Sequence, residues 1–374
     1  MQAVATIDTL PPPAAALRPG RDYAVDLIKG WACLLMVLAH VSFPGAAWLR
    51  YDTMGAVLFF SSTGMNLWGL LQRDRGDDAR IAANGLFLIF AGFASNYTLG
   101  TMGMADVFQS AGMAMIAMLL LNRLLPGFWT WLFPLPFLIH YANQHWFYWK
   151  IADGGLSSFF LTPGLFPLLP WLSFYLLGAH LKRYNSRRMR LVIGATALLG
   201  AGLAVLQNGF VFDKFWMSTD YWCLGLAYTA LILDGLRGWL RRMPHPPLAE
   251  LRRWGGNSLV FYLLHGFVIR LLELWIPSGW WLLAGTLALT ALLLRPALAL
   301  QAWVRRQPPG PVLAICAGAA AAILGLEASY LTGFLARTFI SFGLTLGFLV
   351  AYPAFKQLST RLPAQAPRPA AEMP

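Results

Sequence analysis

The chain has 374 residues, of which 58% are hydrophobic and 12% are charged, and its formal net charge is +12. A soluble domain carries about twice that share of charged residues, so the composition argues against a soluble protein. Apolar segments close to the ~20 residues that a helix needs to cross a bilayer recur along the whole length. We therefore expect an all-α protein, a polytopic integral membrane helical bundle.

The two ends of the chain differ from the rest. Residues 1–22 contain no apolar core of a cleavable signal before Asp22, and they are rich in proline and alanine. Residues 356–374 have the same character. Such composition is typical of disordered tails, so we expect two cytoplasmic tails around one transmembrane domain over 23–355.

Twelve apolar segments predict twelve transmembrane helices. They are 24–43, 54–72, 81–99, 105–122, 127–141, 164–181, 191–207, 221–240, 256–275, 280–303, 312–331 and 335–355. The fifth segment is short and interrupted by prolines, so ten or eleven spans are also compatible with the sequence.

Lysine and arginine are distributed unevenly between the two sets of loops. If the N-terminus is cytoplasmic, only Arg50, Lys150, Lys214 and Arg337 fall on the outer side. This asymmetry is the positive-inside bias of membrane proteins, and it predicts cytoplasmic N- and C-termini in a multi-pass protein of the cytoplasmic (inner) membrane. The basic charge is then a signal of topology, and no basic patch with interleaved aromatic residues indicates nucleic-acid binding.

The first predicted helix carries a stripe of polar and sulfur-containing residues on one face. Its members are Asp22, Asp26, Lys29, Cys33, Met36 and His40, which step by four, three, four, three and four residues. Lys29 and His40 are therefore on the same face, about 16 Å apart along the axis.

Each end of this stripe has two interpretations. Lys29 can be an anchor that reaches the inner interface and pairs with Asp26, or it can hold an anionic group. His40 lies about 22 Å into a ~30 Å hydrocarbon core. An ionisable residue at such a depth indicates a functional site, and imidazole is suited to proton transfer near neutral pH. The alternative is a histidine that only packs in the core.

Four segments resemble membrane acyltransferases. RDYAVDLIKGWACLLMVLAH (21–40) is similar to the first helix of the acyltransferase-three-like superfamily, which has an arginine, ten residues and then a histidine; Lys29 stands in place of the arginine. VLFFSSTGMNLWGLLQR (57–73), FPLLPWLSFYLLGAHLKR (166–183) and GGNSLVFYLLHGFVIR (255–270) are similar, in this order, to the heparan-alpha-glucosaminide N-acetyltransferase catalytic-domain family.

The sequence also departs from that family. Lys29 keeps the positive charge but lacks the guanidinium fork that binds phosphate with two hydrogen bonds. Animal members tend to carry asparagine at the position of His40 and a histidine in the following loop, whereas the loop 41–53 has no histidine. Thr63-Gly64 stands where many relatives have Ser-Gly.

The resemblance implies a donor, an acceptor and roles for particular residues. The donor is acyl-CoA (acetyl-CoA) entering from the cytoplasm, with Lys29 and the loop arginines Arg73, Arg75 and Arg80 as candidates for its phosphates. The acceptor is a hydroxyl or an amine of a glycan or lipid-linked sugar. His40 is the expected general base.

Further site candidates come from other spans. His265 lies mid-span with Tyr262 and Ser258 on the same helix face, so it can line the same cavity or pack in the core. Asp106 and Gln109 open the fourth predicted helix, where Asp106 can cap the helix or orient the acceptor.

The outer segments are rich in aromatic residues. His145 and Trp146 lie in the segment HYANQHWFYWK, which indicates either an interfacial aromatic belt or a platform for stacking a sugar. The six histidines are scattered, so no metal site is predicted. The three cysteines, Cys33, Cys223 and Cys316, all fall in apolar spans and are expected to be buried without disulfides.

We therefore expect a membrane-embedded acyltransferase in contact with the lipid bilayer, and a homodimer is compatible with the sequence. The alternative is a transporter or flippase without covalent chemistry, because proline-broken helices and intramembrane ionisable residues also suit that class; no internal repeat between the two halves supports it. A structural scaffold would account for the aromatic belts but not for His40.

Overall fold

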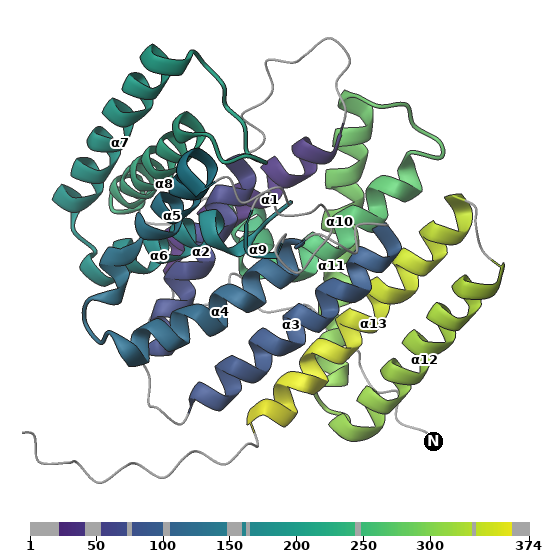
Figure 1. Cartoon of the computed structure of the whole chain (residues 1–374). Helices are drawn as coiled ribbons and strands as arrows, with labels where there is room; N and C mark the ends of the chain where they lie inside the picture. The colour runs from purple at the N-terminus through teal and green to yellow at the C-terminus, as the bar shows by residue number, and fades with distance from the viewer. Residues whose placement is uncertain are drawn as a thin grey trace, which may run out of the picture.

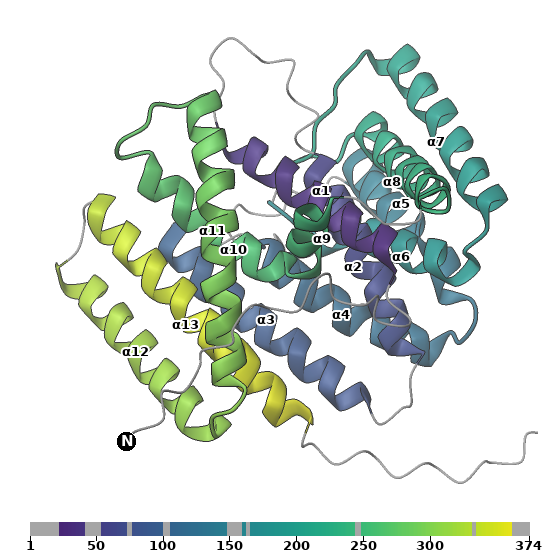
Figure 2. The ribbon, with the colours of Figure 1, turned by 180° about the vertical axis from the view of Figure 1, so that it is seen from behind.

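The computed structural model describes residues 22–41, 54–72, 77–99, 105–147, 159–161, 165–243, 248–330 and 334–360. Within these ranges the chain forms thirteen α-helices, α1 to α13, two shorter helical turns, η3 and η4, and no strand. The helices pack side by side as a bundle (Figures 1 and 2). The protein is thus an all-helical membrane protein, as the composition predicts.

The long helices follow the predicted spans. Their bounds are α1 Tyr23–His40, α2 Met54–Leu71, α3 Asp78–Leu99, α4 Val107–Leu124, α6 Leu168–Tyr184, α7 Arg187–Asn208, α8 Thr219–Leu240, α11 Trp280–Val304, α12 Pro309–Tyr330 and α13 Phe334–Thr360. By length and composition, five of the described helices can cross a membrane, or six if the bent pair of α9 and α10 counts as one. The count of twelve spans stays a prediction.

The fifth predicted span, 127–141, is not a continuous helix. It is divided into η3 Trp129–Leu132, α5 Leu135–Ala142 and the π-helical turn η4 Asn143–Phe147. Pro134 and Pro136 remove backbone donors at the start of α5. An eight-residue helix is about 12 Å long, so α5 is too short to cross a bilayer alone.

The ninth predicted span, 256–275, is confirmed as one helix over residues 258–272, but another helix precedes it, between the eighth and ninth predicted spans. Two helices, α9 Ala249–Gly256 and α10 Ser258–Leu272, meet at an angle of 95°. The break falls at Asn257, whose φ of −126° and ψ of 31° are not helical. Two consecutive glycines precede it, and glycine disfavours the interior of a helix.

Glycines allow direct contact between helix backbones. A Cβ atom added to Gly64 of α2 would lie 1.9 Å from the carbonyl oxygen of Tyr175 in α6, and one added to Gly178 would lie 1.8 Å from that of Ser61. Small residues have this role in many membrane bundles. The α2–α6 contact lies beside the buried core, where the ring of Phe60 stacks on that of Tyr175 at 4.8 Å.

α1 and α9 touch in the same way. A Cβ on Gly30 would lie 2.0 Å from the carbonyl oxygen of Leu251, and one on Gly255 would lie 1.8 Å from that of Asp26. The first half of α1 is therefore covered by α9 (Figure 2). This contact places the start of α10 next to the charged residues of α1.

Ion pairs gather several helix ends at one end of the bundle. Asp22, before α1, accepts hydrogen bonds from Lys182 of α6 at 2.7 Å and from Arg237 of α8 at 2.9 Å. Arg183 of α6 donates to the carbonyl oxygen of Gly127, after α4, and lies over the ring of Trp68 in α2. We call this the basic end. The loop charges assign these same segments to the cytoplasmic side, which stays a prediction.

α13 continues to Thr360, five residues past the predicted span 335–355, and the predicted domain boundary stays a prediction. Residues 361–374 and 1–21, predicted as tails, lie outside the described residues. Cys33 and Cys223 are buried and Cys316 is partly exposed, and none of the three forms a disulfide.

Candidate functional site

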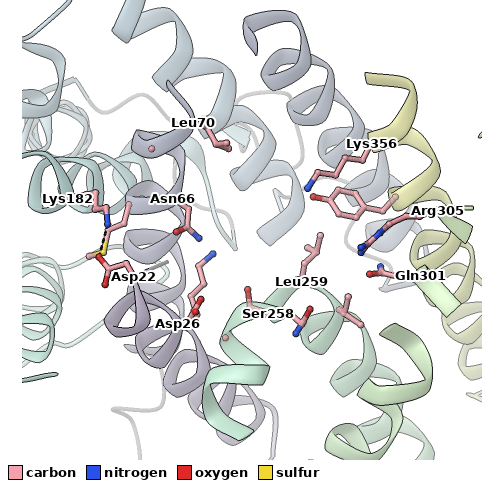
Figure 3. A pocket seen from close by; sticks show the side chains of 18 residues that line it. Asp22, Asp26, Asn66, Leu70, Lys182, Ser258, Leu259, Gln301, Arg305 and Lys356 are labelled. Atoms are coloured by element: carbon pink, nitrogen blue, oxygen red, sulfur yellow. Dashed lines mark hydrogen bonds and ion pairs between the residues drawn. The ribbon is translucent and has the colours of Figure 1, made fainter. Parts of the chain in front are cut away.

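A pocket of about 600 Å³ opens at the basic end. α1 and α2 form one wall, α11 and α13 form the opposite wall, and the start of α10 lies between them (Figure 3). Its volume falls in the range of small-molecule sites. The polar and charged residues that line this basic-end pocket are Asp22, Asp26, Lys29, Asn66, Lys182, Asn257, Ser258, Gln301, Arg305, Tyr352 and Lys356.

Where α1 meets α6 at the edge of the pocket, the charged side chains are paired with one another. Lys182 is paired with Asp22, and Arg237 binds the same carboxylate. Burial raises the pKa of Asp22, but the hydrogen bonds and positive charges of Lys182 and Arg237 outweigh it and hold that pKa below its ordinary value. Asp22 therefore stays ionised near neutral pH. Together with Lys182 and Arg237 it forms a clamp, the Asp22 clamp, that fixes the start of α1 to the ends of α6 and α8.

The opposite wall carries a surplus of positive charge. Lys356 lies just beyond the predicted span 335–355, and its pKa is lowered by burial and then by the charges of Arg305 and Arg80. Cations that repel one another in this way are stabilised when an anion binds between them. Figure 3 shows Arg305 and Lys356 on this wall, across the pocket from Asp26 and Asn66.

The start of α10 adds further donors to the pocket. Gly255, Gly256, Asn257 and Ser258 all line it, so the backbone at the N-terminus of this fifteen-residue helix is accessible. The first N–H groups of a helix lack partners within the helix and attract anions. Together with Lys29 and the cations of the opposite wall, this end of α10 makes the pocket suitable for an anionic ligand.

Two predicted histidines meet at the other end of α1. His40 is the last residue of α1, and its ring lies edge-on to that of His265 in α10, with centroids 5.2 Å apart and an interplanar angle of 62°. His265 is only 2% exposed, whereas His40 is exposed. The tertiary structure thus joins residues that are 225 positions apart in the chain.

The hydrogen bonding of His40 fixes its tautomer. Its Nδ1 lies 2.7 Å from the carbonyl oxygen of Met36, and a carbonyl oxygen can only accept, so Nδ1 donates. In the neutral ring the proton is then on Nδ1, and Nε2 is the basic nitrogen. Neither ring nitrogen of His265 makes a hydrogen bond of good geometry to a described residue, although the backbone of Phe261 and of Tyr262, one turn earlier on α10, lies near the ring. A buried imidazole in that state is suited to a polar group that enters beside it.

Asp106 and Gln109 form a capping box at the start of α4. The Asp106 carboxylate accepts from the backbone N–H of Val107 at 2.6 Å, and the Gln109 side chain accepts from the backbone N–H of Asp106 at 2.9 Å. The interpretation of Asp106 as a helix cap is thereby confirmed. Both side chains are buried, and their part in orienting an acceptor stays a prediction.

Tyr262 connects this cap to the histidines. Its hydroxyl donates to the Asp106 carboxylate at 3.2 Å, and its ring lies 5.3 Å from that of His265. The spacing of three residues between Tyr262 and His265 is visible in the sequence, but the bond from Tyr262 to α4 is not. Asp106 therefore holds α10 in place one turn before His265.

The other predicted site residues are not brought to the histidine pair. Arg80 is paired with Asp77 at 2.7 Å and does not line the basic-end pocket. Arg73 and Arg75 lie outside the described residues, as does the side chain of Trp146. His145 is exposed, and its ring lies 4.2 Å from that of Tyr141, a contact that leads away from α1 and α10.

Sequence reasoning missed three cations that line the basic-end pocket. Lys182, Arg305 and Lys356 read only as charges that indicate topology, because each follows an apolar span. The signal that could have found them is that all three belong to segments assigned to the same side. Assignment to the same side of the membrane does not show which helix ends are neighbours. Only the packing of α11 and α13 places Arg305 and Lys356 across the pocket from α1.

Comparison of the chain with protein-family models, with curated proteins and with solved structures finds no match. Within the part of the chain that the structure describes, no three His, Cys, Asp or Glu side chains are grouped to hold a metal ion.

Proposed function

We propose that the protein is a membrane-embedded acyltransferase that uses cytoplasmic acyl-CoA as its donor and His40 as its general base. One observation carries this proposal: a single helix, α1, lines a cationic pocket at one end and reaches the His40–His265 pair at the other. Lys29 and His40 are about 16 Å apart along the axis. That separation suits a long donor whose phosphates and reacting carbonyl are far apart.

The basic-end pocket is the proposed site for the donor phosphates. Lys29 and Lys356 supply charge from opposite walls, and the start of α10 supplies backbone donors. Charge-assisted hydrogen bonds to phosphate are among the strongest that a protein makes. Acetyl-CoA is the donor that the sequence resemblance favours, and the extended arm of the donor would follow α1 toward His40.

The chemical step assigned to His40 is a proton transfer. Its Nε2 takes the proton from a hydroxyl or amine of the acceptor while the acceptor atom attacks the thioester carbonyl. The C–S bond breaks, and the CoA thiolate leaves and receives the proton from the imidazolium. The bond from Nδ1 to Met36 keeps Nε2 directed outward from α1, and the buried His265 ring limits the rotation of His40.

The acceptor would reach His40 from the end of the bundle opposite to the basic-end pocket. A glycan or a lipid-linked sugar is the class that the resemblance implies. His265, held through Tyr262 and Asp106, would position the acceptor or its proton, because its ring lies 5.2 Å from that of His40 and makes no hydrogen bond of good geometry to a described residue.

A second candidate function is a transporter or flippase. The observation that favours it is the 95° break between α9 and α10, because broken helices form the substrate sites of many transporters. In that case His40 would bind a substrate without covalent chemistry, and the amount of acyl-CoA would not change during transport.

The test uses purified protein in phosphatidylcholine nanodiscs with radiolabelled acetyl-CoA and a panel of amino sugars and lipid-linked saccharides as acceptors. We expect transfer of the label, and we expect His40→Gln to lower kcat by roughly a hundred- to ten-thousand-fold, which is the usual contribution of a positioned base. His40→Gln should bind acetyl-CoA as the parent does. Transfer at the parental rate by this variant would refute the mechanism.

Lys29 tests the donor site separately. Lys29→Gln should weaken acetyl-CoA binding by about ten- to a hundred-fold, because a charge-assisted contact is worth roughly 1.5–3 kcal/mol. Lys29→Arg should retain binding. The matched control is Arg306→Gln, an exposed cation at the end of α11 that does not line the pocket. If Lys29→Gln binds acetyl-CoA like this control, Lys29 is only an anchor.

A further inference from the structure

A second pocket, of about 450 Å³, lies between α7 and α8. Arg187, the first residue of α7, is on one side, and the last two turns of α8 with the residues that follow them are on the other. α7 lies at the edge of the bundle beside α8 (Figures 1 and 2). We call this the α7–α8 pocket; it is lined by Arg187, Asp234, Gly235, Gly238, Trp239, Arg241 and Arg242.

The α7–α8 pocket has positive charge that the protein does not neutralise. Its lining contains three arginines and one acid, Asp234. Asp234 is already bound to the buried Arg190 at 2.9 Å and lies 3.4 Å from Arg187. Among the described residues, no acid pairs with Arg241 or Arg242. The pocket therefore presents two guanidinium groups to an anion from outside the protein.

An apolar surface begins about one turn after Arg187, the arginine that α7 contributes to the pocket. The outer face of α7 exposes branched side chains over 42% to 83% of their area, namely Leu191, Val192, Leu198, Leu199, Leu203 and Leu206. Such a face is suited to acyl chains. Trp239, in the pocket lining, is of the type that lies at the level of lipid headgroups.

We propose that the α7–α8 pocket binds the headgroup of an anionic phospholipid, with its acyl chains along the outer face of α7. Arg241 and Arg242 contact the phosphodiester, since basic pockets between transmembrane helices recognise anionic lipid headgroups. A soluble phosphate would use the same arginines but would gain nothing from the apolar face. The charge of the pocket and its continuity with that face favour the lipid.

The experiment is native mass spectrometry of the purified full-length protein titrated with phosphatidylglycerol or phosphatidylcholine in detergent. We expect a phosphatidylglycerol adduct that saturates at one lipid, with at least tenfold weaker binding of phosphatidylcholine. The double variant Arg241→Gln/Arg242→Gln should weaken phosphatidylglycerol binding at least tenfold. Arg306→Gln, which removes one charge outside the pocket, should change it less than twofold.

A second variant blocks the pocket without changing its charge. Gly238 lines the pocket, and a Cβ atom added to it meets nothing within 4 Å, so the side chain of Gly238→Leu starts in open space beside the two arginines. It should weaken phosphatidylglycerol binding as strongly as the double arginine variant. Unchanged binding in Gly238→Leu, or equal binding of the two lipids, would overturn the proposal. Displacement of the lipid by millimolar inorganic phosphate would instead identify a site for soluble anions and would also overturn it.

Discussion

The backbone contact between α1 and α9 predicts opposite effects of one methyl group at two glycines of the same broken span. In Gly255→Ala the new Cβ would start 1.8 Å from the carbonyl oxygen of Asp26. Ordinary contact begins at 3.4 Å, so α9 and α1 would have to separate by about 1.6 Å. Overpacking of this kind costs typically about 1–3 kcal/mol.

Gly266→Ala is the matched control. Gly266 lies in α10, and a Cβ added there meets nothing within 4 Å. Alanine is more favourable than glycine in a helix by about 0.5–1 kcal/mol, so this variant should be as stable as the parent or more stable. The same chemical change is thus expected to lower stability at one position and raise it at the other.

The measurement is thermal unfolding of each purified protein in one detergent, followed by intrinsic tryptophan fluorescence. We expect Tm to fall by several degrees in Gly255→Ala and not in Gly266→Ala. Gly30→Ala, on the other side of the same contact, should act like Gly255→Ala, and the double variant should cost less than the sum because the contact is already broken. A Gly255→Ala variant that melts at or above the parental Tm would show that the two backbones do not touch.

Three further predictions concern a buried ion pair, the orientation in the membrane and the Asp22 clamp. Asp234→Asn leaves the buried Arg190 without its carboxylate partner; the side chain of Arg190 is 1% exposed and that of Asp234 is 14% exposed. We expect the free energy of unfolding to fall by roughly 3–5 kcal/mol, measured as a large fall in Tm and yield. In a background without native cysteines, Ser186→Cys should be shielded from an impermeant thiol reagent in intact cells and Ser278→Cys should be labelled; the reverse pattern would contradict the orientation. The pKa of Asp22 in the folded protein is held below its ordinary value of 3.8. The stabilisation by the Asp22 clamp is therefore fully present above pH 3.8, and it is lost as the pH falls through the lower pKa of the folded state. Asp22→Asn should therefore melt below the parent near neutral pH, and the gap should close in acid; a gap that is constant across the pH series would refute this clamp.

The sequence by itself determined that the protein is helical and membrane-embedded, and where most helices lie. That information is local, because a long apolar segment can satisfy its backbone in a bilayer only as a helix. The stripe on α1 was also readable, since the spacing of Lys29 and His40 on one helix follows from its geometry. The cap at Asp106 was predicted for the same reason: a helix start is a matter of a few consecutive residues.

Only the tertiary structure decided which of these helices meet. His40 and His265 are both conspicuous in the sequence, but their 5.2 Å approach depends on the packing of α10 against α1. The helix α9 and its 95° bend into α10 were missed, because residues 249–256 lie between two predicted spans and are held against α1 by the contact of Gly255 with Asp26. The cations Arg305 and Lys356 join Lys29 around one pocket for the same physical reason: charges at the ends of separate spans become a site only when helix packing brings those ends together.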